Sequence, residues 1–270
     1  MAPVTDVGQP DPVPDARELL DLAIGAAEDA AELIRAGRPD TVDTKSSGTD
    51  LVTDLDRASE ARIIGRLLDQ RPDDGVLGEE GGERTGSSGV RWIIDPLDGT
   101  TNFVFGYPVY GVSIAAEADG EVVAGVVVDV PQGERYTAVA GGGARRDDRP
   151  IQVSGADDLA TALLATGFSY DPATRGRQAE VLATVLPAVR DIRRSGSAAL
   201  DLCTLAGGRV DAFWERGLAP WDRAAGSLVA TEAGARVGAL EDDEPITLVA
   251  APPALYDAVS DLLRSAGAAF

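Results

Sequence analysis

The chain has 270 residues, with 45 Asp and Glu against 24 Lys and Arg, so its formal net charge is −21; it contains no His and one Cys. This composition excludes triads and dyads that need an imidazole, imidazole metal ligands, internal disulfides and thiolate zinc clusters. The negative charge disfavours nucleic acid and membrane surfaces as partners, and the abundant carboxylates favour a hard cation such as Mg²⁺ or Mn²⁺.

The first 14 residues contain four Pro and two Asp, with neither a basic nor an apolar segment. This composition predicts a disordered tail and not a signal peptide. No apolar run approaches the roughly 18 residues that a membrane span requires. We therefore expect a cytoplasmic protein.

Apolar residues at helical spacing predict a first helix at about 15–35, which begins after Pro14 and ends before Gly37 and Pro39. A polar stretch follows, and Thr53 can cap a second helix at about 54–70. The pattern then changes to that of strands, with an Asp119-Gly120 turn inside a hairpin. These strands are expected at 76–77, 91–95 (ending at Pro96), 109–117, 121–130 and 135–140.

The last third of the chain alternates between strand patterns and helical patterns, which is typical of a layered α/β fold. Strands are expected at 162–166, 191–194, 210–214 and 246–250, and helices at 174–189, 197–206, 222–233 and 254–265. A glycine-containing stretch near 141–150 suggests a boundary. We therefore predict a tail at 1–14, an N-terminal α+β subdomain at 15–145 and a C-terminal α/β subdomain at 146–270.

The motif WIIDPLDGTTNF at 92–103 carries the clearest chemical signal. A buried strand that ends at Asp95 and bends at Pro96 can direct Asp95, Asp98 and the Leu97 carbonyl toward one ion. The glycine and threonines that follow offer backbone N–H groups to a phosphate. Metal ligands beside a phosphate cradle are what phosphoryl transfer requires, although an Asp/Pro/Gly turn alone is common.

Three further clusters gain weight from this motif. GEE at 78–80 follows a short strand, where Glu79 can bridge cations. In KSSGTDLVTDLD at 45–56, Asp50 lies in a polar loop and is the functional candidate, whereas Asp56 is interpreted as structural because it lies in a first helical turn. Asp222, in PWD at 220–222, would by itself be interpreted as a helix cap.

Together these motifs make the chain resemble the inositol monophosphatase family of magnesium-dependent, lithium-sensitive phosphatases. The resemblance runs from about residue 15 to the C-terminal helix and includes WDRAAGSLVATEAGA at 221–235 and RRSGSAALDLCTLAGGRVDAFWE at 193–215. It implies a layered αβαβα sandwich, of the type shared with fructose-1,6-bisphosphatase, and a homodimer.

The resemblance also implies a role for each matching residue. Glu79, Asp95 and the Leu97 carbonyl would hold one Mg²⁺, Asp95, Asp98 and Asp222 a second, and Glu79 a third through water, with Mn²⁺ as a possible substitute. Asp50 and Thr100, with Glu79, would activate the attacking water, and Lys45 either steers phosphate or is solvated. The expected substrate contacts are made by Asp98, Gly99, Thr100, the Ala198 backbone, Glu215 and Asp222.

The expected activity is hydrolysis of myo-inositol monophosphate, a small phosphorylated polyol. Histidinol phosphate, fructose 1,6-bisphosphate and 3′-phosphoadenosine 5′-phosphate are alternative substrates on the same fold. Two other classes stay open, namely a haloacid-dehalogenase-type phosphatase, disfavoured by the two residues between Asp95 and Asp98, and a non-enzymatic cation-binding regulatory protein. Cys203, without a His to activate it, is interpreted as a buried apolar residue.

Overall fold

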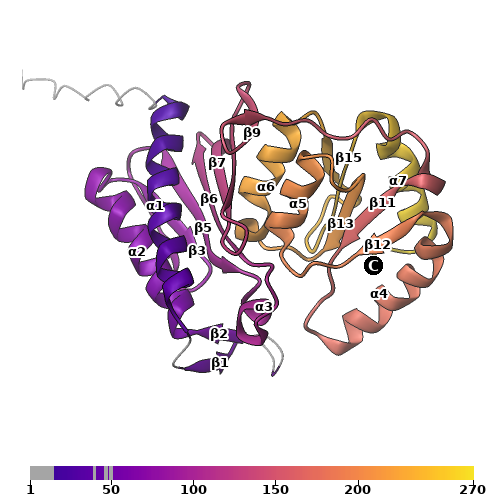
Figure 1. The fold of residues 1–270 in the computed structure, drawn as a ribbon, viewed down its shortest axis with the longest axis horizontal. Coiled ribbons are helices and arrows are strands. Elements are labelled where there is room, and N and C mark those ends of the chain that lie inside the picture. Colours follow the sequence, from indigo (N-terminus) through magenta and orange to yellow (C-terminus); the bar gives the residue numbers. More distant parts are fainter. Residues whose placement is uncertain (1–14, 39–40, 46–47, 49–50) are drawn as a thin grey trace, which may run out of the picture.

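Helices and two sheets alternate in five layers in the computed structural model, which describes residues 15–38, 41–45, 48 and 51–270 (Figure 1). Helices α1 and α2 cover one face of the first sheet, α5 and α6 lie between the sheets, and α4 and α7 cover the second sheet. The predicted αβαβα sandwich is therefore confirmed, whereas the predicted tail at 1–14 lies outside the described residues. None of the helices described is long and apolar enough to cross a bilayer.

The two outer helices begin where their capping signals predict. In α1 (Ala16–Ala36) the Asp15 side chain accepts the Arg17 N–H, and a stripe of Ala and Leu faces the sheet. In α2 (Asp54–Gln70) the Thr53 hydroxyl accepts the N–H groups of Leu55 and Asp56. Each cap satisfies donors that the first helical turn leaves without an intrahelical partner.

The first sheet has the strand order β10-β9-β8-β7-β6-β5-β3-β4. Its neighbouring strands are antiparallel, except that β3 and β5 run parallel. A separate hairpin, β1–β2, occupies the stretch that the sequence presented only as polar. The strand bounds are β1 Val42–Thr44, β2 Leu51–Thr53, β3 Gly75–Gly78, β4 Gly82–Arg84, β5 Val90–Asp98, β6 Gly111–Ala118, β7 Glu121–Asp129, β8 Glu134–Val139, β9 Gly143–Arg146 and β10 Arg149–Pro150.

The second sheet has the order β12-β11-β13-β15-β14, with β11 parallel to both of its neighbours. The first sheet ends at β10 and the second begins at β11; the division between 145 and 146 stays a prediction. The remaining elements are α3 Thr100–Phe105, β11 Leu163–Thr166, α4 Pro172–Val185, β12 Asp191–Arg193, α5 Ala198–Ala206, β13 Ala212–Arg216, α6 Pro220–Glu232, β14 Arg236–Ala239, β15 Thr247–Ala251 and α7 Pro253–Ser265, with short 3-10 turns at Leu159–Thr161 and Leu186–Ala188.

A buried polar network sets the parallel pairing of β3 and β5. Asp74, which precedes β3 and is 1% exposed, accepts the Trp92 Nε1–H at 2.9 Å and the Arg71 Nε–H at 2.6 Å. Ser88, just before β5, donates to the same carboxylate. One side chain therefore joins the end of α2 and the starts of both strands, which aligns their carboxyl ends.

We expect Asp74→Ala to lower the free energy of unfolding by about 3 kcal/mol, because it leaves the Trp92 N–H and the Arg71 guanidinium without their buried partner. Urea denaturation measures this change. Asp69→Ala, at an exposed position near the end of α2, is the control and should change stability by less than about 0.5 kcal/mol. Equal effects of the two substitutions would contradict the role given to Asp74.

Candidate functional site

Glu79 and Asp95 meet because their strands are parallel neighbours. Glu79 directly follows β3, and its backbone N–H donates to the Ile94 carbonyl of β5 at 3.2 Å. Asp95 is 2% exposed, and its Oδ1 accepts the Leu97 N–H at 3.1 Å. A hydrogen bond also joins the two carboxyl groups. The carboxyl ends of β3 and β5 thus place two acids within hydrogen-bonding distance of each other.

Strand β5 does not end at Pro96, as the sequence suggested; it continues to Asp98. The continuation contains an irregularity, because the register against β6 shifts between Asp95 and Asp98. Such a shift redirects side chains at the edge of a ladder. It gives Asp98 a direction different from the one that regular alternation would impose.

Gly99 then turns the chain into α3 with a φ of 92°, in the left-handed region that favours glycine. A Cβ at this position would lie 2.9 Å from the Val109 carbonyl. Thr100 follows, and its Oγ1 lies 2.8 Å from Asp56 Oδ1 and 3.0 Å from the Leu97 carbonyl. A hydroxyl has one hydrogen, so it donates to one of these acceptors at a time.

Asp98 connects the first sheet to the middle helices. Its Oδ2 accepts the Ser197 hydroxyl at 2.6 Å and the Ala199 N–H at 2.8 Å, and the Ala198 amide also donates to this carboxylate. Burial raises the pKa of Asp98 to about 6, against the lowering effect of these hydrogen bonds.

Asp222 comes from the other side of the site, in the first turn of α6. Its Oδ2 accepts the Ala219 N–H at 2.7 Å, so it is the third helical residue and not the cap. Burial, and then the charges of Asp98 and Glu79, raise the pKa of Asp222 to about 8. Asp222, Asp98 and Glu79 therefore repel one another where the start of α6 approaches the carboxyl ends of β3 and β5.

Glu215, on β13, lies beside the Gly167 backbone, and burial raises its pKa well above the ordinary value. A cleft of about 490 Å³ has Glu215, Asp222, Phe168, Tyr170 and Arg177 among its lining residues. The cleft gives a small substrate access to these two carboxylates.

These acids fit a divalent cation by their chemistry. Burial, and then the charges of Glu79, Asp98 and Asp222, raise the pKa of Asp95 well above its usual value. The available donors are carboxylate and peptide oxygens, which Mg²⁺ and Mn²⁺ prefer. Within the described ranges no group of three or more acids already stands in metal-ligand geometry.

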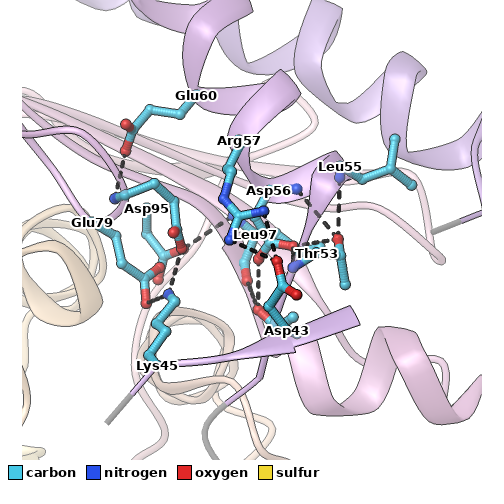
Figure 2. Close-up of polar contacts among 12 residues, drawn as sticks. Asp43, Lys45, Thr53, Leu55, Asp56, Arg57, Glu60, Glu79, Asp95 and Leu97 are labelled. Atoms are coloured by element: carbon cyan, nitrogen blue, oxygen red, sulfur yellow. Dashed lines mark hydrogen bonds and ion pairs between the residues drawn. The ribbon is translucent and has the colours of Figure 1, made fainter. Parts of the chain in front are cut away.

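Lys45 points toward the acidic cluster, although its side chain keeps 23% of its accessible surface. Its Nζ lies 2.8 Å from Glu79 Oε1 and also contacts Glu80 (Figure 2). Burial lowers the pKa of Lys45, but the two carboxylates outweigh burial and raise it above its ordinary value. The ammonium therefore neutralises part of the acidic cluster from the β1 side.

Not every residue expected from the sequence can be placed. Asp50 lies outside the described residues, so its expected role stays a prediction. Thr100 contacts Asp56, which the sequence presented as structural. Asp56 also completes the cap of α2 by accepting the Thr53 N–H at 2.9 Å. The helical spacing of the sequence could have indicated that Asp56 is buried. It places Asp56 on the same face of α2 as three other buried residues, Ser59, Glu60 and Ile63.

A further buried acid lies behind the site. Asp201 is on α5, and burial raises its pKa to about 7. An unfolded Asp releases its proton near pH 4, whereas folded Asp201 keeps its proton until about pH 7. Because the folded state binds the proton more tightly, this residue makes stability fall as the pH rises between these two values.

We therefore expect Asp201→Asn to gain about 4 kcal/mol of stability, relative to the unmodified chain, between pH 4 and pH 8, because Asn cannot ionise and a pKa shift of about three units corresponds to this free energy. Urea denaturation across this range measures the gain. Asp69→Asn, at an exposed site on α2, should leave the pH profile unchanged. Parallel profiles for Asp201→Asn and the unmodified chain would contradict the predicted shift.

Known relatives share both sequence and fold with the chain. Inositol-1-monophosphatase SuhB of Mycobacterium tuberculosis is 51% identical over 213 residues, which cover 75% of this chain and 73% of that protein. A protein named Nus factor SuhB from Pasteurella multocida is 44% identical over 225 residues, which cover 81% and 84% of the two chains.

Solved structures agree with these sequence matches. The extragenic suppressor protein suhB of Bartonella henselae superposes with a TM-score of 0.86 at 36% identity, covering 92% of this chain and 98% of that one. The Mycobacterium tuberculosis SuhB structure gives 0.82 at 42% identity, with 94% and 98% covered. The model of the family described as "Inositol monophosphatase family" matches residues 15–260. The chain belongs to the inositol monophosphatase family.

Proposed function

We propose that the chain is a Mg²⁺-dependent phosphomonoesterase that hydrolyses myo-inositol monophosphate to inositol and phosphate. The observation that carries this proposal is the meeting of Glu79, Asp95, Asp98 and Asp222, three of which have raised pKa values. Such a cluster is electrostatically unfavourable without cations and becomes favourable with them. Family membership supports a phosphatase, and the substrate and the metal are our proposal.

The ligands divide into two overlapping sets. We assign Glu79, Asp95 and the Leu97 carbonyl to one ion, and Asp95, Asp98 and Asp222 to a second, with Glu79 able to serve a third through water. Bound Mg²⁺, or Mn²⁺ in its place, would acidify the attacking water and neutralise charge on the phosphoryl oxygens. The chain therefore needs no histidine base.

The chain's own contribution to water activation comes from Thr100. When its hydroxyl donates to Asp56, an Oγ1 lone pair faces away and can accept hydrogen from the attacking water. As the water oxygen bonds to phosphorus, the bond between phosphorus and the inositol oxygen breaks. The water proton would pass to Thr100 and the threonine proton to Asp56, and the departing inositol oxygen would take up a proton from solvent water. Asp50, which the sequence favours for this role, is a second candidate. Backbone amides of Gly99 and Thr100 would bind the phosphoryl oxygens.

The alcohol part of the substrate would occupy the cleft. Asp98, Glu215 and Asp222, together with the Ala198 backbone, supply acceptors and a backbone group for its hydroxyls. We expect the enzyme to be cytoplasmic, lithium-sensitive and homodimeric, without nucleic acid or membrane as a binding partner. Phe105 is 79% exposed and Tyr107 55%, which supports a protein surface packing against this region.

A phosphate-release panel tests the activity and the substrate together. We expect Mg²⁺-dependent release from myo-inositol monophosphate, inhibition by Li⁺, and slower release from histidinol phosphate, fructose 1,6-bisphosphate and 3′-phosphoadenosine 5′-phosphate. Asp98→Asn should lower kcat by about 1,000-fold, since it removes charge from a proposed shared ligand. Asp69→Asn is the control. Preference for another substrate, or a near-normal rate in Asp98→Asn, would contradict the assignment.

The Asp56 and Thr100 pair has its own test. Thr100→Ala should lower kcat by about 100-fold with little change in KM, because it removes a group needed for proton transfer. Thr100→Ser keeps the hydroxyl and should retain most of the activity. A normal rate in Thr100→Ala would exclude the proposed proton route and leave the assigned metal ligands unaffected.

A second candidate function is regulatory binding to another protein. It is favoured by one observation, that several relatives carry the name Nus factor SuhB. A wild-type chain that binds Mg²⁺ but releases no phosphate from any member of the panel would support this alternative. Trapping of a phosphorylated aspartate would instead support the haloacid-dehalogenase-type chemistry.

A further inference from the structure

Glu60 lies behind the turn that carries Glu79. It is on α2, one helical turn after Asp56, and it is 4% exposed. Its Oε2 accepts the backbone N–H of Glu80 at 2.9 Å (Figure 2). The Gly81 amide donates to the same carboxylate. Glu60 thus contacts the turn through the turn's backbone.

The turn fits closely around this carboxylate. A Cβ on Gly78 would lie 2.4 Å from Glu60 Oε2, and a Cβ on Gly81 would lie 2.6 Å from Oε1. Real Cβ atoms do not approach other atoms so closely, so a side chain at either position would force the Glu60 carboxylate or the turn to shift. The two glycines flank Glu79 and Glu80, which lets the backbone close around the Glu60 side chain.

Glu79 is therefore fixed from two directions. Its own N–H donates to Ile94 of β5, while the next N–H along the chain donates to Glu60 of α2. These bonds join the turn to a strand on one side and to a helix on the other. Two backbone anchors on adjacent residues leave Glu79 little freedom besides rotation of its side chain.

The same face of α2 contacts the other ligand segment. Asp56 Oδ1 accepts the Thr100 hydroxyl, and Ser59 Oγ donates to the Pro96 carbonyl at 2.9 Å. Asp56, Ser59 and Glu60 stand at i, i+3 and i+4, the spacing that shares one helical face. One buried polar face thus contacts both the 78–81 turn and the 95–100 segment.

We infer that Glu60 is a positioning residue, whose carboxylate holds the 78–81 turn so that Glu79 faces Asp95. The inference rests on the proposed function in taking Glu79 as a metal ligand. Glu60 does not touch substrate in this role; it acts through the backbone of Glu80 and Gly81. A carboxylate suits the task because its two oxygens can each accept an N–H.

The test compares Mn²⁺ binding by calorimetric titration of the full chain with Mg²⁺-dependent phosphate release. Glu60→Ala should weaken Mn²⁺ binding by about 10- to 100-fold, the usual effect of losing a residue that orients a ligand. At saturating metal the KM for substrate should stay within about twofold. Glu60→Gln keeps one acceptor for the Glu80 N–H and should recover most of the lost affinity.

Gly81→Ala perturbs the same contact from the turn and leaves α2 unaltered. It should also weaken Mn²⁺ binding, because the new Cβ displaces the turn from the Glu60 carboxylate. If Glu60→Ala does not fold, this variant decides the question. Gly65→Ala, on α2 with nothing within 4 Å of the added Cβ, is the matched control and should bind Mn²⁺ normally.

The outcomes separate this inference from the proposed function. Wild-type Mn²⁺ affinity in folded Glu60→Ala and Gly81→Ala would overturn the positioning role while leaving the phosphatase proposal intact. Mn²⁺ binding that is strong in the wild type and weak in both variants, without phosphate release from any substrate, would overturn the phosphatase proposal and support the positioning role. A wild-type chain that binds no Mn²⁺ would overturn both.

Discussion

Repulsion among buried carboxylates is the constraint on which the rest of this site depends. Glu79, Asp95, Asp98 and Asp222 come from three elements. Burial, and then the charges of neighbouring acids, raise the pKa values of Asp95, Asp98 and Asp222. Like charges in a poorly hydrated site are unfavourable unless protons, cations or hydrogen bonds offset them. Each neighbouring element can be understood by how it offsets this repulsion.

Three elements share that task in different ways. Helix α5 donates hydrogen bonds to Asp98 through Ser197 and Ala199, and the segment after β1 brings the Lys45 ammonium against Glu79. The buried face of helix α2 carries Asp56, Ser59 and Glu60. Their hydrogen bonds hold the Thr100 hydroxyl, the Pro96 carbonyl and the Glu80 N–H, which are neighbours of the acids and not the acids themselves. Divalent cations would neutralise the remaining negative charge. The ions proposed for catalysis would therefore also stabilise the folded site.

The parallel pairing of β3 and β5 is the exception in the first sheet that makes the arrangement possible. In an antiparallel pair, residues that follow the two strands lie at opposite ends, so Glu79 and Asp95 would be far apart. The Asp74 network aligns this pair at its other end, beside Trp92. The hydrogen bonds of Asp74 at the amino-terminal ends of β3 and β5 therefore help to set how Glu79 and Asp95 meet near the carboxyl ends of the same strands.

The sequence by itself determined the elements and the kind of chemistry. Capping signals and apolar periodicity predicted α1 and α2 within about one residue, and the order of motifs identified oxygen ligands of the type that Mg²⁺ prefers. These features are local, because a cap or a motif depends on residues near it in the chain. The short strand β1 was missed because three exposed residues carry no detectable alternation of apolar and polar positions.

Only the tertiary structure decided which residues meet. Dipole arguments favour an Asp in a first helical turn whatever lies opposite it, so the sequence could not reveal that Asp56 faces Thr100, 44 residues away. Lys45 and Glu60 likewise differ from solvated residues only through partners on other elements. Which distant residues come into contact depends on the direction and register of the strands and on the rotation of the helices about their axes. The packing of the whole sandwich sets all three at once.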